Sequence, residues 1–412
     1  MSAEATHRPG IAQWTTWAPI LGAVVLAATW GRSLPGVVAV LVTAALFGAV
    51  LAAVHHAEVI AAKVGEPLGS IVLAVAVTVI EVGLIVTLMA SGKDGVETLA
   101  RDTVFAALMI TINGIAGLCI FLGAGRRGLA RFNPEGSAAA LAGVVTVAGL
   151  CLVLPTFTSA RSGPEFSPSQ LAFAAISSIG VYAMFVLTQT VRHRDFFVPV
   201  DRAGKPLDDE GDEDAHGPAP STRAALVSLG LLVVALVAVV GLAKVLSPSI
   251  EQAVDAAGFP QSFVGVVIAL VVLLPETLAA AKYARAARVQ NSLNLAYGSA
   301  MASIGLTIPT LAALSPFLSS PLELGLGSMH IVLLVLSLVV GILTIVQGRA
   351  TRFSGWILLV LLFAYVFLAA NPRPASGQRA RACVLDRSPR GRAHPLRRIR
   401  LRGTRPDYCG LS

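Results

Sequence analysis

The feature that most constrains this chain is an acidic residue inside a long apolar stretch. Residues 65–92 read GEPLGSIVLAVAVTVIEVGLIVTLMASG, and the run from Leu68 to Ala90 predicts a single helix. At 1.5 Å per residue such a helix is long enough to cross a bilayer. Glu81 lies near its middle, where a charged side chain costs roughly 2.5–3.5 kcal/mol on insertion scales. Glu81 therefore either holds helices together or forms an ion or proton site.

A second stretch favours the ion or proton site. The segment Gln261–Tyr283, QSFVGVVIALVVLLPETLAAAKY, carries Glu276 in the same manner. Glu81 follows Pro67 by fourteen residues, and Glu276 follows Pro260 by sixteen. Two similar helices with one acid each indicate a duplicated unit whose halves share one site.

Composition places the chain in a membrane. Of its 412 residues 55% are hydrophobic and 13% are charged, whereas about a quarter of a soluble domain is charged. The four cysteines lack the spacing of a metal site or a disulfide framework: Cys119, Cys151, Cys383 and Cys409. The N-terminus lacks a cleavable signal pattern, and the chain from Trp17 onward is interpreted as a first span.

The formal net charge of +8 comes from the C-terminal tail. After Asn371 the chain has eleven arginines and two aspartates, so the preceding body is almost neutral. The pI therefore does not imply nucleic-acid binding. Residues 371–412, rich in Arg, Pro and Gly, are predicted to form a disordered basic tail.

Eleven apolar spans are predicted, and the fold class is an all-α integral membrane protein. The spans are approximately 17–31, 35–54, 68–90, 103–123, 137–155, 169–190, 224–246, 262–281, 292–314, 328–347 and 355–370. A cytoplasmic N-terminal segment, 1–16, would put fifteen basic residues of the body inside and five outside, in agreement with the positive-inside rule. The region 192–223 between spans six and seven is then an acidic cytoplasmic linker.

The spans divide into two sets of five. Span 1 stands alone, which leaves spans 2–6 within residues 17–191 and spans 7–11 within residues 224–370. Because five is odd, the second set enters the membrane from the opposite side. Glu81 and Glu276 each lie in the second span of a set. This pattern predicts an inverted repeat with a site near the membrane midplane.

Polar residues in the spans that follow the two glutamates are further candidates. Asn113 and Ser303 are predicted to line the site with Glu81 and Glu276. Thr78 and Ser299 are interpreted either as packing contacts or as site-lining residues. Pro275, beside Glu276, is expected to loosen its helix and free carbonyl oxygens for a cation.

Charged groups near the span ends receive more ordinary interpretations. His55, His56 and Glu58 are interpreted mainly as interfacial residues. The six acids of Asp208–Asp214 form either a solvated linker or a cation-collecting or regulatory patch.

These residues resemble a known family. GEPLGSIVLAVAVTVIEVGLIVTLMASG, ARDTVFAALMITINGIAGLC, QTVRHRDFF, FPQSFVGVVIALVVLLPETLAA and SLNLAYGSAMASIGLTIP are similar to ChaA-type calcium/proton antiporters of the calcium:cation antiporter superfamily. The resemblance covers roughly residues 17–370. It implies one extra span plus two inverted five-span repeats, with Glu81 and Glu276 as the two essential acids. In the related eukaryotic-type exchangers an asparagine commonly stands three residues before each glutamate, where this chain has Thr78 and Leu273. The number of ligands and the ion preference therefore stay open.

The expected function is exchange of Ca²⁺ for H⁺ by alternating access across a bacterial cytoplasmic membrane. The alternatives are Na⁺/H⁺ or K⁺/H⁺ antiport on the same fold and, less favoured, a cation channel. An enzyme is disfavoured because no catalytic constellation accompanies the glutamates. No cofactor is expected. The expected partners are inorganic cations, protons and membrane lipid, without nucleic acid or ATP.

Overall fold

Thirteen α-helices make up most of the part of the chain that the computed structural model describes, which is residues 14–32, 34–65, 68–89, 96–125, 128–200, 220–318 and 321–371. Apolar runs of roughly 20 residues form helices because only a helix satisfies its own backbone hydrogen bonds in lipid. The helices are α1 (Trp14–Thr29), α2 (Gly36–Val64), α3 (Leu68–Met89), α4 (Leu99–Met109), α5 (Ala116–Gly123), α6 (Pro134–Ala148), α7 (Pro168–Leu187), α8 (Thr222–Ala256), α9 (Phe263–Val272), α10 (Leu274–Arg285), α11 (Val289–Leu314), α12 (Ser328–Ile345) and α13 (Arg352–Ala370).

The helices agree with a multi-pass membrane protein. Nine helical segments in the described part of the chain are long and apolar enough to span a membrane, counting α4 and α5 as one segment. The bent pair α9–α10 is a tenth if its two arms form one span. The predicted first span is α1, a shorter helix of 16 residues. A count of eleven is therefore reached only if α1 also crosses.

Two helices extend beyond their predicted ends by ten residues each. The prediction ended the second span at residue 54, whereas α2 continues to Val64, and Gly65 follows it with a φ of 76°. Glycine tolerates this left-handed conformation and commonly ends helices. His55, His56 and Glu58 therefore lie inside α2. Likewise α8 continues to Ala256 through Pro248.

The span that carries Glu276 is broken. Helix α9 ends at Val272, α10 begins at Leu274, and the two axes are bent by 53°. Pro275 explains the break, because proline has no backbone N–H to continue the α9 hydrogen-bond ladder and is tolerated in the first turn of a new helix. The expected loosening at Pro275 is thus a complete interruption.

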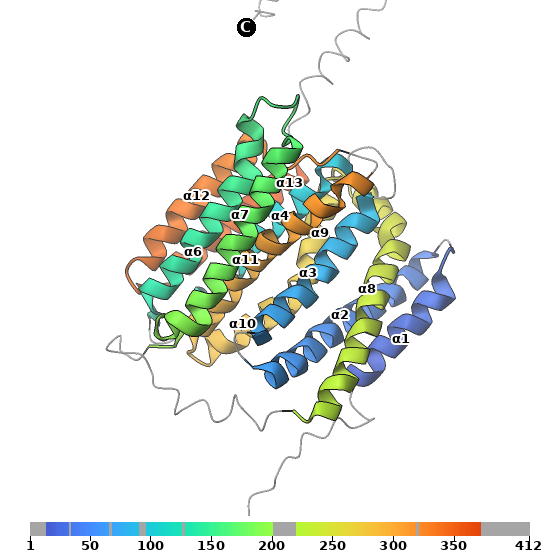
Figure 1. The fold of residues 1–412 in the computed structure, drawn as a ribbon, viewed down its shortest axis with the longest axis horizontal. Helices are drawn as coiled ribbons and strands as arrows, with labels where there is room; N and C mark the ends of the chain where they lie inside the picture. The colour runs from blue at the N-terminus through green and yellow to red at the C-terminus, as the bar shows by residue number, and fades with distance from the viewer. Residues whose placement is uncertain are drawn as a thin grey trace, which may run out of the picture. The chain divides into compact units, whose positions relative to one another are not determined.

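The halves pack reciprocally, as two inverted repeats are expected to do. The acidic helix α3 packs against α11, while α9 and α10 pack against α4 and α5 (Figure 1). The last helix of each half likewise packs on the third span of the other half, α7 on α11 and α13 on α5. At the α5–α13 crossing, Gly117 and Gly355 bring the backbones so close that a Cβ on Gly355 would lie 2.7 Å from the Gly117 carbonyl oxygen.

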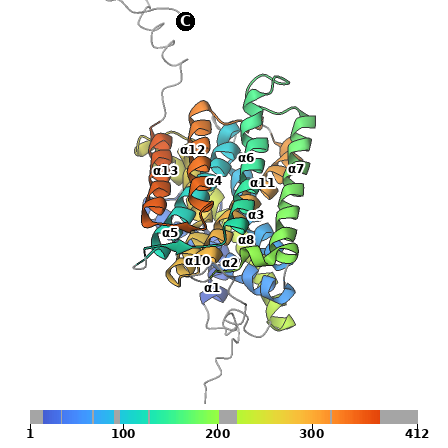
Figure 2. The same cartoon turned by 90° about the vertical axis from the view of Figure 1, so that its left-hand side faces the viewer.

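The outer helices complete the bundle. Helices α1, α2 and α8 pack on one another on one flank of Figure 1, and α6, α7, α12 and α13 run side by side in the turned view of Figure 2. Two short strands, β1 (Ala130–Arg131) and β2 (Arg349–Ala350), pair antiparallel with Ala130 opposite Ala350 and connect the two halves.

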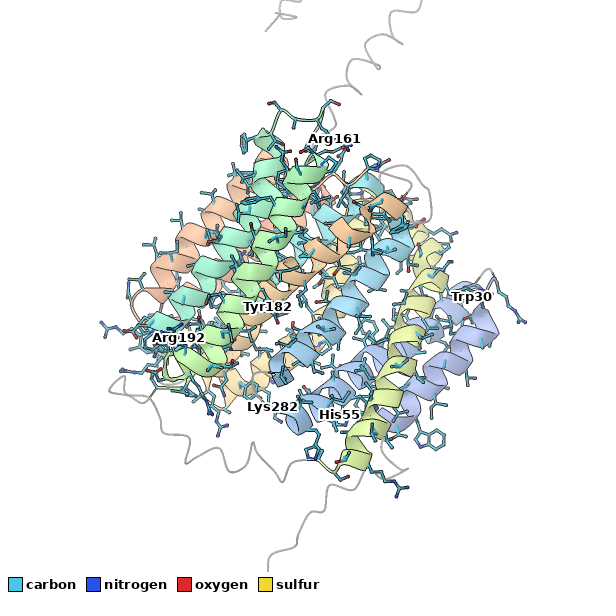
Figure 3. The ribbon with its side chains drawn as sticks, in the orientation of Figure 1. Trp30, His55, Arg161, Tyr182, Arg192 and Lys282 are labelled. Atoms are coloured by element: carbon cyan, nitrogen blue, oxygen red, sulfur yellow. The ribbon has the colours of Figure 1, made fainter. Side chains whose placement is uncertain are left out.

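Residues labelled in Figure 3 mark the two ends of the bundle. Figure 3 places His55, Arg192 and Lys282 at one end and Trp30 and Arg161 at the other. The cytoplasmic location of the end with Arg192 and Lys282 stays a prediction. The six acids of the linker and the basic tail lie outside the described residues.

Candidate cation site

Glu81 is buried and hydrogen-bonded to hydroxyl groups of the opposite half. Its side chain on α3 is 3% exposed. The Ser303 hydroxyl donates toward Glu81 Oε1 at 2.7 Å and Oε2 at 2.9 Å, and the Thr307 hydroxyl donates to Oε2 at 3.1 Å. Ser303 and Thr307 are one turn apart on α11, so both present their side chains to the same partner. The structure therefore brings together Glu81 and Ser303, two residues that the sequence predicted.

A small cavity lies against this cluster, with room for about one water molecule. Four helices line it, α3, α4, α9 and α11. Its polar wall consists of the Glu81 carboxyl group and three hydroxyl side chains, those of Thr103, Ser299 and Ser303. Ser299, left open between packing and lining, therefore lies on the cavity wall. The apolar remainder is Val77, Ala107, Ala269, Val272 and Leu273.

The cavity-lining positions of the two halves correspond in sequence. Thr103 and Ala107 follow Glu81 by 22 and 26 residues, and Ser299 and Ser303 follow Glu276 by 23 and 27. Each pair is separated by one helical turn, on α4 or on α11. Inverted repeats are expected to show this correspondence. The two halves nevertheless differ in side-chain chemistry, because Ala107 occupies the place that matches Ser303.

Glu276 lies in the first turn of α10, directly after the break. Its side chain is 7% exposed, and among the described residues Oε2 finds no hydrogen-bond partner. Glu276 itself is not among the residues that line the cavity, although Val272 and Leu273 just before it are. Thr103 Oγ1 on the cavity wall is likewise buried, with no hydrogen-bond partner in the described part of the chain. Buried polar groups without partners are rare, and a bound ion or water is one arrangement that satisfies them.

Two predicted residues lie elsewhere. Asn113 is fully buried in a π-helical turn, Ile110–Ile115, and donates to Ser337 Oγ of α12 at 2.9 Å. It follows Glu81 by 32 residues, five more than separate Ser303 from Glu276, so the two do not occupy matching places. Thr78 donates to the carbonyl oxygen of Ala74 in its own helix. Neither residue lines the cavity.

Sequence reasoning missed Thr103 and Thr307. Thr307 was detectable as the hydroxyl one turn after Ser303, and Thr103 as the counterpart of Ser299 once the halves are aligned on their glutamates. In the described part of the chain no three or more His, Cys, Asp or Glu side chains are grouped as a metal centre. The site is instead one of carboxyl and hydroxyl oxygens, which suits a hard cation.

Comparisons with known proteins agree with this architecture. The profile of the Sodium/calcium exchanger protein family matches residues 20–191 and 227–371, which are the two halves. The chain is 46% identical over 366 residues to y4hA of Sinorhizobium fredii, covering 87% of this chain and 96% of that protein. It is 34% identical over 352 residues to the Sodium-potassium/proton antiporter ChaA of Escherichia coli, covering 84% of this chain and 93% of ChaA.

The fold has been seen before. The crystal structure of the H⁺/Ca²⁺ exchanger CAX superposes with a TM-score of 0.62 at 15% identity, covering 90% of each chain. Fold, site and sequence together define a membrane cation antiporter of the calcium:cation antiporter superfamily. Within that class, the chain belongs to the sodium/calcium exchanger family.

Proposed function

We propose that this antiporter exchanges a cation for protons through alternating access, with Glu81 and Glu276 as the groups that both species occupy. The observation that carries the proposal is that the two halves meet at the site. Each half supplies one buried glutamate, and Ser303 and Thr307 of the second half donate hydrogen bonds to Glu81 of the first. A carboxyl group holds either a proton or a cation, and that competition is the basis of exchange.

Coupling follows from the cost of burying charge. Two uncompensated carboxylates in a low-dielectric interior are unfavourable, so the site is expected to change its exposure only when a cation or protons neutralise it. The hydroxyl groups of Ser299, Ser303, Thr307 and Thr103 supply additional oxygen ligands without adding charge.

The cargo proposed from the family resemblance is Ca²⁺, which takes six to eight oxygen ligands. Two carboxyl groups and the surrounding hydroxyl groups support that cargo. Monovalent Na⁺ or K⁺ is the second candidate, and two observations favour it. ChaA, at 34% identity, is named a sodium-potassium/proton antiporter. On the cavity wall Ala107 offers no side-chain oxygen at the place where the other half has Ser303.

A flux assay tests the proposal. Purified protein in proteoliposomes receives a pH jump, and Ca²⁺, Na⁺ and K⁺ movements are followed separately together with internal pH. Proton movement that depends on one of these cations, and cation movement that depends on the pH step, are expected. Cation conductance without proton movement would instead indicate a channel.

A further inference from the structure

Glu58 of α2 lies between the buried glutamates and the membrane surface. It stands six residues before Val64, the end of α2, which is about 9 Å along the helix axis. Lys282 stands six residues after Glu276 and three before Arg285, the end of α10. Helices α2 and α10 contact each other, and Figure 3 shows Lys282 at the same end of the bundle as His55, which is three residues before Glu58.

Glu58 interacts electrostatically with two charged groups of α10, one near the end of the helix and one in its first turn. Its carboxyl group attracts Lys282, and its charge also acts on Glu276, which in turn interacts with Glu81. The residue Glu58 is exposed, whereas Glu276 and Glu81 are buried. Three carboxyl groups therefore form a series that leads from the aqueous end of α2 and α10 into the site.

A structural ion pair does not account for this placement. An exposed Glu–Lys pair contributes about 0–1 kcal/mol, and here Glu58 also repels a buried carboxyl group of a neighbouring helix. A cation that passes between Glu58 and Glu276 would relieve this repulsion.

The other half contains a comparable glutamate near the end of α8. Glu251 precedes Glu276 by 25 residues, as Glu58 precedes Glu81 by 23, and it stands five residues before Ala256. It is buried and accepts a hydrogen bond from Ser247 Oγ at 2.8 Å. In an inverted repeat Glu251 belongs to the opposite membrane face. A variant at Glu251 therefore tests whether an effect on the cation KM is confined to one face.

We infer that Glu58 is the entry residue for the cation on the face where α2 and α10 end, and that Lys282 occupies it between transport events. The inference rests on the proposed function. Glu58 positions and concentrates the cation for Glu276 and is not itself part of the central site. It is therefore expected to govern the apparent affinity on one face rather than the maximal rate.

Kinetics in membrane vesicles of the two orientations, which present the two faces separately, tests the inference. Glu58→Gln is expected to raise the KM for the transported cation about 3- to 10-fold on the α2–α10 face, because one attracting charge is lost from the entry path, with the maximal rate kept. Lys282→Met is expected to lower that KM. Both effects should shrink in 0.5 M choline chloride, because salt screens exposed charges.

Two variants serve as comparisons. Glu135→Gln removes an exposed carboxyl group from the first turn of α6 and is expected to leave KM unchanged. Glu251→Gln is expected to leave KM on the α2–α10 face unchanged. An unaltered KM in Glu58→Gln, or an equal change on both faces, overturns the role of Glu58 while leaving the antiport intact. Absence of exchange in the unsubstituted protein overturns the proposed function and this inference together.

Discussion

At the residue scale, the two glutamates have different surroundings although they occupy equivalent places. Glu81 accepts hydrogen bonds from Ser303 and Thr307, whereas Oε2 of Glu276 has no partner in the described part of the chain. Both are central to the proposed exchange. Glu81→Gln and Glu276→Gln should insert and fold, since loss of a membrane-buried charge relieves a cost.

Each glutamine variant is expected to lose cation flux driven by a pH gradient together with proton release driven by the cation. Glutamine keeps the size of glutamate but can neither ionise nor carry a proton. Glu81→Asp and Glu276→Asp should be milder. Flux at matched protein levels decides the matter, and near-parental exchange in either glutamine variant would assign that glutamate a structural role.

The hydroxyl groups around Glu81 lead to a second prediction. Ser303→Ala removes a hydrogen bond to a buried carboxyl group, a type of contact with a net contribution of about 1.5–3 kcal/mol. The KM for the cation should rise roughly 10- to 100-fold, as measured by initial exchange rates. Thr310→Val is the matched control, because Thr310 is exposed on the same helix and its hydroxyl donates to the carbonyl oxygen of Leu306, one turn earlier. Equal effects in both variants would contradict a role of Ser303 in the site.

Only some of the residues at the candidate site could be predicted from the sequence. Glu81 and Glu276 stood out because a charge in an apolar helix is costly. Both side chains are buried, Glu81 on the cavity wall and Glu276 in the first turn of α10. Asn113 attracted attention for a similar reason, yet it faces Ser337 of α12, outside the cavity. A sequence shows that a polar residue lies in a span, whereas the direction it faces depends on cross-helix packing.

At the scale of elements, the break between α9 and α10 determines where Glu276 stands. Pro275→Ala restores a backbone N–H and favours one continuous helix, which would move Glu276 out of the first turn of α10. We expect thermal stability in detergent to be unchanged or higher and the exchange rate to fall about tenfold or more.

Pro248→Ala is the control for this change, since α8 runs continuously through Pro248. It should leave the rate intact. An undiminished rate in Pro275→Ala would mean that the proline is not needed to position Glu276. The sequence predicted an irregularity here, but not two helices at 53°, because proline alone permits a kink, a bulge or an interruption.

At the scale of the whole molecule, the two halves are recognisable from sequence and the packing between them is not. Hydropathy located the spans. Because each half has five spans, an odd number, the second half was predicted to be inverted relative to the first. The exchange of neighbours, with α3 on α11 and α9–α10 on α4–α5, depends on side-chain shapes such as the close approach of Gly117 and Gly355. Those contacts join residues well over a hundred positions apart, and a single sequence carries no signal for them.

The basic tail is predicted to be dispensable. The family profile ends at residue 371, and the tail lacks an apolar face that could pack on the bundle. A chain ending at Asn371 should insert and exchange at the parental rate, as measured in the proteoliposome assay. Loss of insertion or flux in this truncated chain would show that the tail contributes to folding or transport.

The interleaving of the halves also affects biosynthesis. The hydroxyl groups that bond Glu81 belong to residues made 222 and 226 positions later. At 5–20 residues per second, the ribosome needs about 10–45 s to reach them. Throughout that interval the nascent first half contains Glu81, whose charge is costly to bury in the membrane, while its hydrogen-bond partners have not yet been translated.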